Sequence, residues 1–250
     1  MAALTVAITG KTFPAVGAAA SRHVLDRLQF SVEAGETVVL TGPSGCGKTT
    51  LLNIIAGLDA RFDGRIEMPE ETRIGYVFQE PRLLPWRTVE ENLRLVLRGG
   101  EAEVDRRVGE VLAEVGLAEA HHVYASRLSL GMARRVAIAR AFVVRPTLLL
   151  LDEPFVSLDE PTAARLRRLL LELLTAHRVT TLFITHNLRE AIMLADRLVF
   201  LSESPARIVA EVPVPLDRTA RADEAAIEDF RTRLGELPAL LDRGMAEPTP

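Results

Sequence analysis

Residues 37–56, TVVLTGPSGCGKTTLLNIIA, combine a short apolar strand, a glycine-rich turn and the start of an amphipathic helix. Val38 to Thr41 are apolar or β-branched, which is typical of a buried strand. The next eight residues match G-x-x-x-x-G-K-[ST], and leucine and isoleucine then recur at helical spacing. Glycines let backbone N–H groups point at an anion, and the helix N-terminus adds its positive dipole end. A glycine-rich turn can also serve packing alone, but this order favours a site for nucleotide phosphates.

The turn, which we call the phosphate loop (residues 42–49), offers the groups that a triphosphate needs. The Lys48 ammonium can reach the β- and γ-phosphates, and the Thr49 hydroxyl can ligate Mg²⁺. Cys46 is the one cysteine of the chain, and we interpret it as a small filler rather than a redox switch. The residues predicted to bind the nucleotide are Gly42, Pro43, Ser44, Gly45, Cys46, Gly47, Lys48, Thr49 and Thr50.

The bulk composition restricts the class of protein. The 250 residues are 48% hydrophobic, enough for a sizeable core, yet no apolar run approaches the roughly 18 residues of a membrane span. The N-terminus lacks the cationic start and apolar block of a signal sequence. The net charge of −4 argues against nucleic acid as a main partner. We expect a chain in the cytosol, or one held at a membrane by other subunits.

The segments around the phosphate loop predict an α/β fold. Residues 4–9 and 28–33 alternate like strands of a small antiparallel sheet, with a loop over 14–20 between them. Further strands are expected at 65–68, 74–78, 147–151, 180–185, 197–201 and 206–212, and further helices at 162–176 and 222–234. Residues 213–220 are predicted to be a linker, and the tail after Arg243 to be loose.

Residues 88–141 have helical patterns and no strand signal. Thr88-Val-Glu-Glu91 matches a capping box and opens a helix expected to run to Leu97. Two more helices are expected over 101–115 and 132–144, the last capped by Ser129. We therefore predict a single domain, residues 1–243. Its parts are a core (about 1–87 and 142–212), an inserted helical lobe (about 88–141), a C-terminal helix (about 221–234) and a loose tail (244–250).

An acidic pair follows the strand predicted at 147–151. Four leucines without alternation fit a strand buried on both faces, and open α/β sheets place their chemistry at the carboxyl ends of such strands. Asp152 is expected to hold Mg²⁺, through water. Glu153 is expected to be the general base that polarises the hydrolytic water, a role that contributes about 10²–10⁴-fold in rate.

Three more side chains are candidates for the same site. Gln79 follows the strand at 74–78, where a glutamine can contact the γ-phosphate, Mg²⁺ or the attacking water. His186 follows the strand at 180–185, where its ring can donate a hydrogen bond to the γ-phosphate. Phe13 closes the first strand region and either stacks on an adenine ring or is an ordinary packed phenylalanine, the two readings being equally favoured.

These pieces, in this order, resemble the ATPase subunit of an ABC (ATP-binding cassette) transporter over nearly the whole chain. The six collinear motifs are GPSGCGKT (42–49), VFQEPRLLPW (77–86), RLSLGMARRVAIARA (127–141), LLLLDEP (148–154), SLD (157–159) and ITH (184–186). The resemblance implies a P-loop NTPase core with a mostly parallel sheet, an N-terminal antiparallel β subdomain and an inserted α-helical lobe. It also implies Mg²⁺-dependent hydrolysis of ATP.

The resemblance further implies a head-to-tail dimer with two ATP molecules between the subunits. Lys48, Thr49, Gln79, Asp152, Glu153 and His186 would line one nucleotide, with Thr49, Gln79 and Asp152 as Mg²⁺ ligands. Ser129 and the Gly131 amide would contact the γ-phosphate of the nucleotide on the other subunit, and Asp159 would help link the two sites. Phe13 would be the adenine-stacking aromatic, although residues 14–21 lengthen the usual spacing.

The segment 127–141, which we call the signature segment, departs from the usual family pattern. Leu130 stands where a glycine is expected, and Ala133-Arg134 stands where a polar residue and glutamine often follow. A leucine adds bulk and restricts φ and ψ beside a backbone that approaches phosphate. Ser129 can still cap the helix, so we expect a slower or retuned ATPase that is not inactive.

QEPRLLPWRTVEENL, DEPFVSLDEPTAARL and the ESPARI turn are most similar to the nitrate, sulfonate and taurine importers. That resemblance implies integral permease subunits, a periplasmic solute-binding protein acting indirectly, and a place at the cytoplasmic face of the inner membrane. A permease helix is expected to dock at residues 81–86, the alternative being that their apolar side chains pack under the helical lobe. Two alternatives stay open: a soluble ABC-type mechanical ATPase, or an ATP-binding regulator with weak turnover.

Overall fold

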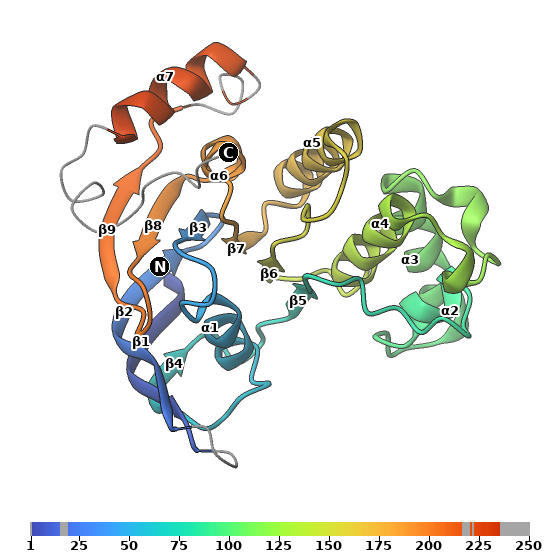
Figure 1. Ribbon diagram of the computed structural model, residues 1–250. Helices are drawn as coiled ribbons and strands as arrows, with labels where there is room; N and C mark the ends of the chain where they lie inside the picture. Colours follow the sequence, from blue (N-terminus) through green and yellow to red (C-terminus); the bar gives the residue numbers. More distant parts are fainter. Residues whose placement is uncertain (1, 16–19, 217–220, 222, 236–250) are drawn as a thin grey trace. The chain divides into compact units, whose positions relative to one another are not determined.

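The computed structural model describes residues 2–15, 20–216, 221 and 223–235 (Figure 1). The chain divides into two compact units, which we describe separately. Unit 1 comprises Met1–Glu70 and Thr180–Pro250, and unit 2 comprises Glu71–Val179. The helical lobe predicted at 88–141 lies within unit 2, and the domain boundaries predicted from the sequence stay a prediction.

Unit 1 contains an antiparallel sheet of β1 (Ala2–Phe13), β2 (Arg22–Glu33) and β4 (Asp63–Glu67), in the order β2-β1-β4. Leu4, Val6 and Ile8 alternate with more exposed residues along β1 and are buried, as expected for a strand with one covered face. The predicted antiparallel N-terminal sheet is confirmed, and β1 and β2 are longer than predicted.

Unit 1 also contains three parallel strands, β7 (Thr180–Ile184), β3 (Thr37–Thr41) and β8 (Arg197–Leu201), with β9 (Ile208–Pro213) antiparallel to β8. All residues of β3 and β7 are buried, which explains their continuous apolar sequences. The helices of this unit are α1 (Lys48–Ile55), α6 (Leu188–Leu194) and α7 (Glu224–Gly235).

Unit 2 contains the parallel pair β5 (Ile74–Val77) and β6 (Leu148–Asp152). Its helices are α2 (Val89–Arg94), α3 (Glu101–Glu114), α4 (Leu130–Phe142) and α5 (Glu160–His177), with short 3₁₀ turns at Ala118–Ala120 and Ala125–Arg127. Helices α2, α3 and α4 pack together, and α4 also contacts β5 (Figure 1). The capping box at Thr88 is confirmed, because Thr88 and Glu91 accept each other's backbone N–H.

Several boundaries differ from the sequence-based expectation. The helix expected to run to Leu97 ends at Arg94, and Leu95 is its C-cap. Helix α6 was not predicted, because seven residues are too few to show a helical period. Residues 16–19 of the predicted loop, 217–220 of the predicted linker, and the predicted tail lie outside the described residues. In the part of the chain that is described, every helix is too short or too polar to cross a bilayer.

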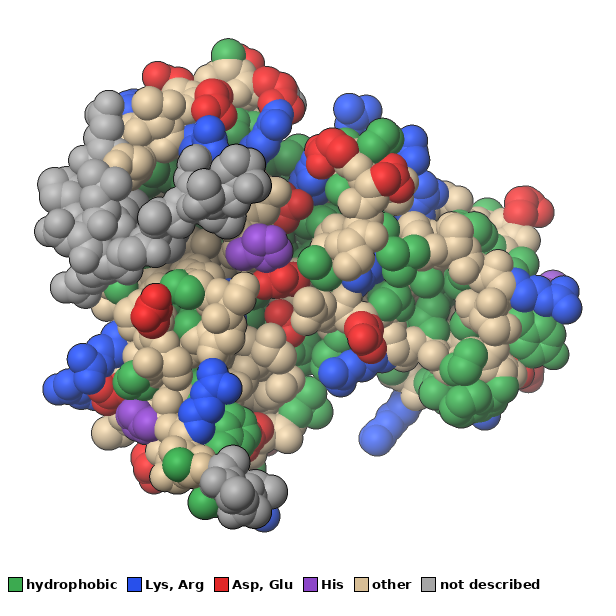
Figure 2. Space-filling model, viewed as in Figure 1, with side chains coloured by type: hydrophobic (Ala, Val, Ile, Leu, Met, Phe, Trp, Pro, Cys, Tyr) green, Lys and Arg blue, Asp and Glu red, His purple; other side chains and the backbone are tan. Residues whose placement is uncertain are grey.

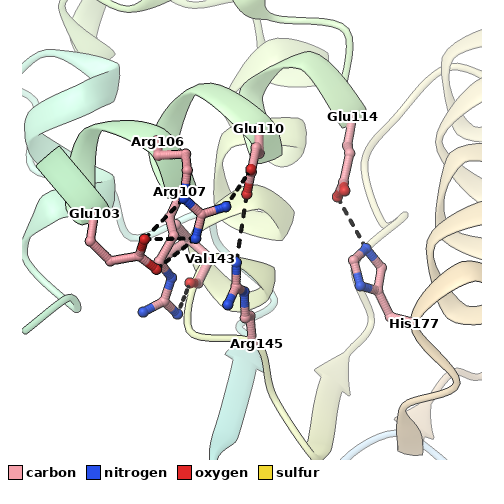
Figure 3. Close-up of polar contacts among 8 residues, drawn as sticks. All are labelled: Glu103, Arg106, Arg107, Glu110, Glu114, Val143, Arg145 and His177. Carbon is pink, nitrogen blue, oxygen red and sulfur yellow. Dashed lines mark hydrogen bonds and ion pairs between the residues drawn. The ribbon is translucent and has the colours of Figure 1, made fainter.

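Hydrogen bonds and ion pairs connect α3 to the segment after α4 and to α5 (Figure 3). Arg107 donates to the Val143 carbonyl oxygen, Arg145 pairs with Glu110 at 3.7 Å, and His177 lies 3.1 Å from Glu114. Exposed ion pairs of this kind contribute about 0–1 kcal/mol each, so buried apolar residues such as Val108 and Leu112 dominate the attachment of α3.

Candidate nucleotide site

The phosphate loop of unit 1 has a backbone that only glycine fits at two positions. A Cβ at Gly42 would lie 2.7 Å from the Leu201 carbonyl oxygen. Gly47 has φ +122°, and a Cβ there would lie 2.7 Å from Val24 Cγ1. The first turn of α1, which follows directly, has no side-chain cap, the arrangement by which helix N-termini bind phosphate. Steric exclusion therefore allows only glycine at these two positions of the loop.

Lys48 lies inside the loop. Its side chain is buried, and its ammonium donates to the carbonyl oxygens of Gly42 (2.8 Å) and Pro43 (2.9 Å). Because an ammonium carries three N–H donors, it can hold both carbonyls and still donate to a phosphate oxygen. Thr49 is exposed in the first turn of α1.

Cys46 is buried, with 1% of its surface exposed. Burial raises the pKa of its thiol above the ordinary value, against the opposing charge of Lys48. A buried thiol with a raised pKa is a poor nucleophile, so the geometry supports the filler interpretation over the redox switch.

The pairing of β3 with β7 brings His186 to the edge that carries the phosphate loop. Leu40 pairs with Ile184, and Gly42 and His186 each lie two residues further along these parallel strands. Asn187 follows at once and caps α6 by accepting from the N–H groups of Arg189 and Glu190. His186 is thus held between a buried strand and a capped helix.

Phe13 and the phosphate loop are connected through Arg22. Phe13 pairs with Arg22 across β1 and β2, and the Arg22 guanidinium donates to the Gly45 carbonyl oxygen at 2.8 Å. The Phe13 ring is 40% exposed, and the Lys11 ammonium lies 4.6 Å from its centre. Phe13 is therefore partly exposed on a strand pair that is bonded to the phosphate loop, and its stacking on adenine stays a prediction. Arg22 is a residue that sequence reasoning missed.

Unit 2 repeats the strand-edge arrangement. Val77 pairs with Leu151 in the parallel pair of β5 and β6, and Gln79 and Glu153 each lie two residues further along. Asp152 is buried at the end of β6, and burial together with the charge of Asp152 raises the pKa of Tyr76 on β5. The carboxyl edge of this pair therefore carries the predicted acids and the glutamine.

The backbone after β6 is strained. Glu153 has φ +43° and Ser157 has φ +65°, a left-handed conformation that costs a non-glycine residue about 1–2 kcal/mol. Strain of this kind persists where the surrounding structure imposes it, and it is concentrated at functional sites. The segment 153–159, which we call the acidic turn, is consistent with such a site.

The first turns of α4 and α5 are in contact through Gly131 and Thr162. Ser129 caps α4 by accepting from the Met132 N–H at 3.3 Å, and Asp159 caps α5 by accepting from the Thr162 N–H at 3.0 Å. The bond to Thr162 lowers the pKa of Asp159. A Cβ at Gly131 would lie 2.9 Å from Thr162 Cγ2, so the two helix N-termini are packed closely.

Leu130 adopts ordinary helical backbone angles as the first residue of α4, so the φ and ψ limits of a leucine cause no strain. Its side chain is 44% exposed. If Leu130 slows ATP hydrolysis, it therefore does so through the bulk of its side chain at the exposed start of α4.

Sequence reasoning gave no structural role to Arg134 and Asn92. Both are buried polar residues in unit 2 whose side chains hydrogen-bond to distant or loop backbone groups. Arg134 lies two residues before the buried run 136–139 of α4, and an arginine at such a position was the one available signal.

The predicted Mg²⁺ ligands suit that ion chemically. The Thr49 hydroxyl in unit 1, and the Asp152 carboxylate and Gln79 amide in unit 2, are hard oxygen donors. Within the described residues no group of three or more His, Cys, Asp or Glu could hold a metal ion. Mg²⁺ in P-loop enzymes needs no such group, because nucleotide phosphates and water supply most of its ligands.

A family model described as ABC transporter matches residues 25–156. The chain belongs to the ABC transporter family. The cassette is 46% identical over 198 residues to "Aliphatic sulfonates import ATP-binding protein SsuB 1" of Pseudomonas savastanoi pv. phaseolicola, covering 79% of this chain and 82% of that protein. It is 39% identical to SsuB of Bacillus subtilis over 220 residues, 86% of each chain.

Solved structures agree with this assignment. The ATP-binding cassette MJ0796, solved as a post-hydrolysis dimer with ADP and Pi, is 28% identical, with a TM-score of 0.73 over 86% of this chain and all of that one. The cbiO1 cassette from Clostridium perfringens, 24% identical, has the same fold, with a TM-score of 0.74 over 96% and 99% of the two chains. The predicted family and fold class are confirmed, and the cassette is an ATP-hydrolysing enzyme.

Proposed function

We propose that this cassette drives an importer of aliphatic sulfonates or closely related small anions. The relatives described above carry that function in their names and match most of the chain. The catalytic part of the proposal is supported by the register of two parallel strand pairs, β3 with β7 and β5 with β6. It places the phosphate loop and His186 at one carboxyl edge in unit 1, and Gln79 and Glu153 at another in unit 2.

The roles of the residues follow from their chemistry. Lys48 and the N–H groups of the phosphate loop bind the phosphates of ATP, and Phe13 stacks on the adenine. Thr49, Asp152 and Gln79 hold Mg²⁺, which when bound offsets the charge of the phosphates. Glu153 takes the proton of the attacking water, and His186 donates a hydrogen bond to the γ-phosphate.

The active form in this proposal is a head-to-tail dimer. Ser129 and Gly131 lie at the exposed start of α4, where they can contact the γ-phosphate held by a second subunit. Asp159, which caps the neighbouring helix α5, links the two sites. The dimeric state of the MJ0796 cassette supports this arrangement.

A pocket of about 500 Å³ in unit 2 is suited to a helix of a membrane permease. Tyr76 and Phe78 stack on one another along it, the Arg82 guanidinium lies over the Phe78 ring, and Leu95 and Val96 expose about half of their surface. Figure 2 shows hydrophobic side chains at the surface over α2 and α4. Trp86, two residues after the lining residue Leu84, is 69% exposed, and apolar surface of this kind is costly to leave in water.

Attachment through this pocket would place the cassette at the cytoplasmic face of the inner membrane. A periplasmic solute-binding protein would act on it only indirectly, through the permease. These membrane and periplasmic subunits would select the transported anion.

The catalytic assignment is tested by Glu153→Gln, with the exposed Glu119→Gln as a control that loses the same charge. We expect E153Q to keep ATP binding and to lose about 10²–10⁴-fold in Mg²⁺-dependent turnover, because the general base is removed. Full turnover in E153Q would refute the role of Glu153.

The transport assignment is tested in a strain that lacks this chain. We expect it to fail to grow on an aliphatic sulfonate as the only sulfur source and to recover with the parent gene but not with E153Q. Normal growth without the chain would refute the substrate class. Failure to co-purify with a membrane protein would favour the soluble mechanical ATPase, and absence of turnover in the parent would favour the regulator.

A further inference from the structure

Arg134 is a buried cation on the signature helix. It lies on α4, five residues after the cap Ser129, and only 3% of its surface is exposed. Its guanidinium is an extended, always charged donor that can bond several acceptors at once. In the sequence, Arg134 is a departure from the usual family pattern.

The two ends of this guanidinium bind two separate loops. One terminal nitrogen donates to the Gln79 carbonyl oxygen, directly after β5. The other donates to the Val156 carbonyl oxygen in the acidic turn at 3.1 Å. A single side chain therefore joins α4 to the backbone of the predicted Mg²⁺-ligand loop and to the turn that begins at Glu153.

These contacts are an inefficient way to stabilise a fold. Among the described residues, no carboxylate forms a salt bridge with Arg134, and its Nε is buried without a hydrogen-bond partner. Even a buried ion pair often contributes no more to stability than apolar residues of similar volume, and a buried cation without such a pair lacks the attraction that offsets its desolvation. The arrangement is better explained by what it connects than by what it adds to stability.

We propose that Arg134 is a positioning residue that holds the Gln79 loop and the acidic turn in fixed relation to the Ser129 end of α4. Because α4 is a continuous helix, a shift of either loop moves the surface that meets the second subunit. The contacts that Gln79 and Glu153 make with the nucleotide of their own subunit are thereby coupled to the contact that Ser129 makes with the nucleotide of the second subunit. The functional part of this inference rests on the proposed function, and the structural part does not.

The test compares Arg134→Met with Arg135→Met in the full-length protein. Both remove one positive charge from adjacent positions of α4, but Arg135 is hydrogen-bonded to neither Gln79 nor Val156 in the described structure. We expect R134M to lower kcat at saturating ATP by about 10- to 100-fold, as loss of positioning does, with KM for ATP changed less than about twofold. R135M should keep the parent kcat.

Two readouts separate positioning from a structural role. The Tm of R134M should fall by no more than a few degrees, because two hydrogen bonds of modest net strength are lost while the desolvation of a buried charge is relieved. Hydrogen–deuterium exchange should rise in peptides covering 78–81 and 154–159 and nowhere else. Arg134→Lys, which keeps donors near both carbonyls, should recover part of kcat. A parent-like kcat, unchanged exchange at both segments, or a lower Tm with exchange raised throughout unit 2 would each overturn the proposal.

Failure of this inference is distinguishable from failure of the proposed function. Full turnover in E153Q would remove the catalytic roles, yet the exchange pattern of R134M would still test the contacts of Arg134. Parent-like exchange in R134M, beside a slow E153Q, would remove the positioning role alone.

Discussion

The two strand edges of the cassette share a register, but the loops that follow them are held differently. In unit 1, the phosphate loop leaves β3 through Gly42 and Gly47, whose positions admit no Cβ, and Lys48 and Arg22 add hydrogen bonds to its carbonyl oxygens. In unit 2, the loops after β5 and β6 are held by side chains that donate to backbone carbonyls. Arg134 binds at residues 79 and 156, Arg140 at 81 and 82, and Asn92 at 84, 87 and 88.

The difference indicates which edge can move. Any residue larger than glycine at these two positions would require the surrounding strands to shift, because protein interiors are close-packed. Loops held by a few hydrogen bonds, each worth about 0.5–1.5 kcal/mol net, can exchange partners at modest cost. The strained residues Glu153 and Ser157 belong to this second kind of loop. We infer that the loops of unit 2 change conformation more readily than the phosphate loop of unit 1.

The largest effect, on ATP binding, is expected from Gly47→Ala in the phosphate loop, where no Cβ fits. The new Cβ would lie 2.7 Å from Val24 in a backbone with φ +122°, so the loop must deform and ATP binding should be lost. Gly99→Ala is the matched control, because Gly99 has φ +141° but open space around it. Calorimetric titration with ATP measures the result, and near-parent affinity in G47A would break the comparison.

A smaller effect is expected from Asn92→Ala on the hydrogen-bonded side. Asn92 is fully buried, accepts from the Leu84 N–H at 2.8 Å and donates to the carbonyl oxygens of Leu84 and Thr88. Its loss leaves buried groups unpaired, which costs about 1–3 kcal/mol each. Thermal unfolding should show a Tm lower by several degrees, with ATP affinity unchanged because the phosphate loop is in unit 1. A parallel loss of ATP affinity would show that the two edges are not independent.

The smallest effect is expected from Leu130→Gly, which restores the glycine usual in the family. Leu130 causes no backbone strain, so only its exposed bulk can slow the enzyme, and kcat should rise by a few-fold. Turnover at saturating ATP, at a protein concentration that supports dimers, is the measurement. A variant that is no faster, with unchanged ATP affinity, would remove the idea of a retuned ATPase.

The sequence predicted those parts of the site that depend on local chemistry. The phosphate loop, the capping box at Thr88 and the Ser129 cap each require particular residues at short spacing, and the structure contains all three. Strands β3, β6 and β7 were predicted because burial on both faces leaves a continuous apolar sequence. The antiparallel sheet followed from alternation.

Long-range contacts could not be predicted in this way. The bonds from Arg134 to residues 79 and 156 span 55 and 22 positions, and nothing local in the sequence records them. Helix α6 was missed because Asn187 caps a helix of only seven residues. The joint action of the predicted site residues on one nucleotide stays a prediction.

Trp86 is the one tryptophan of the chain, it is 69% exposed, and it lies two residues after Leu84, which lines the pocket of unit 2. Its emission is therefore a label-free optical signal from a single, known location. Seating of a permease helix over it would exclude water from the indole and shift the emission to shorter wavelength. Assembly of the transporter could thus be followed in real time with the unmodified protein.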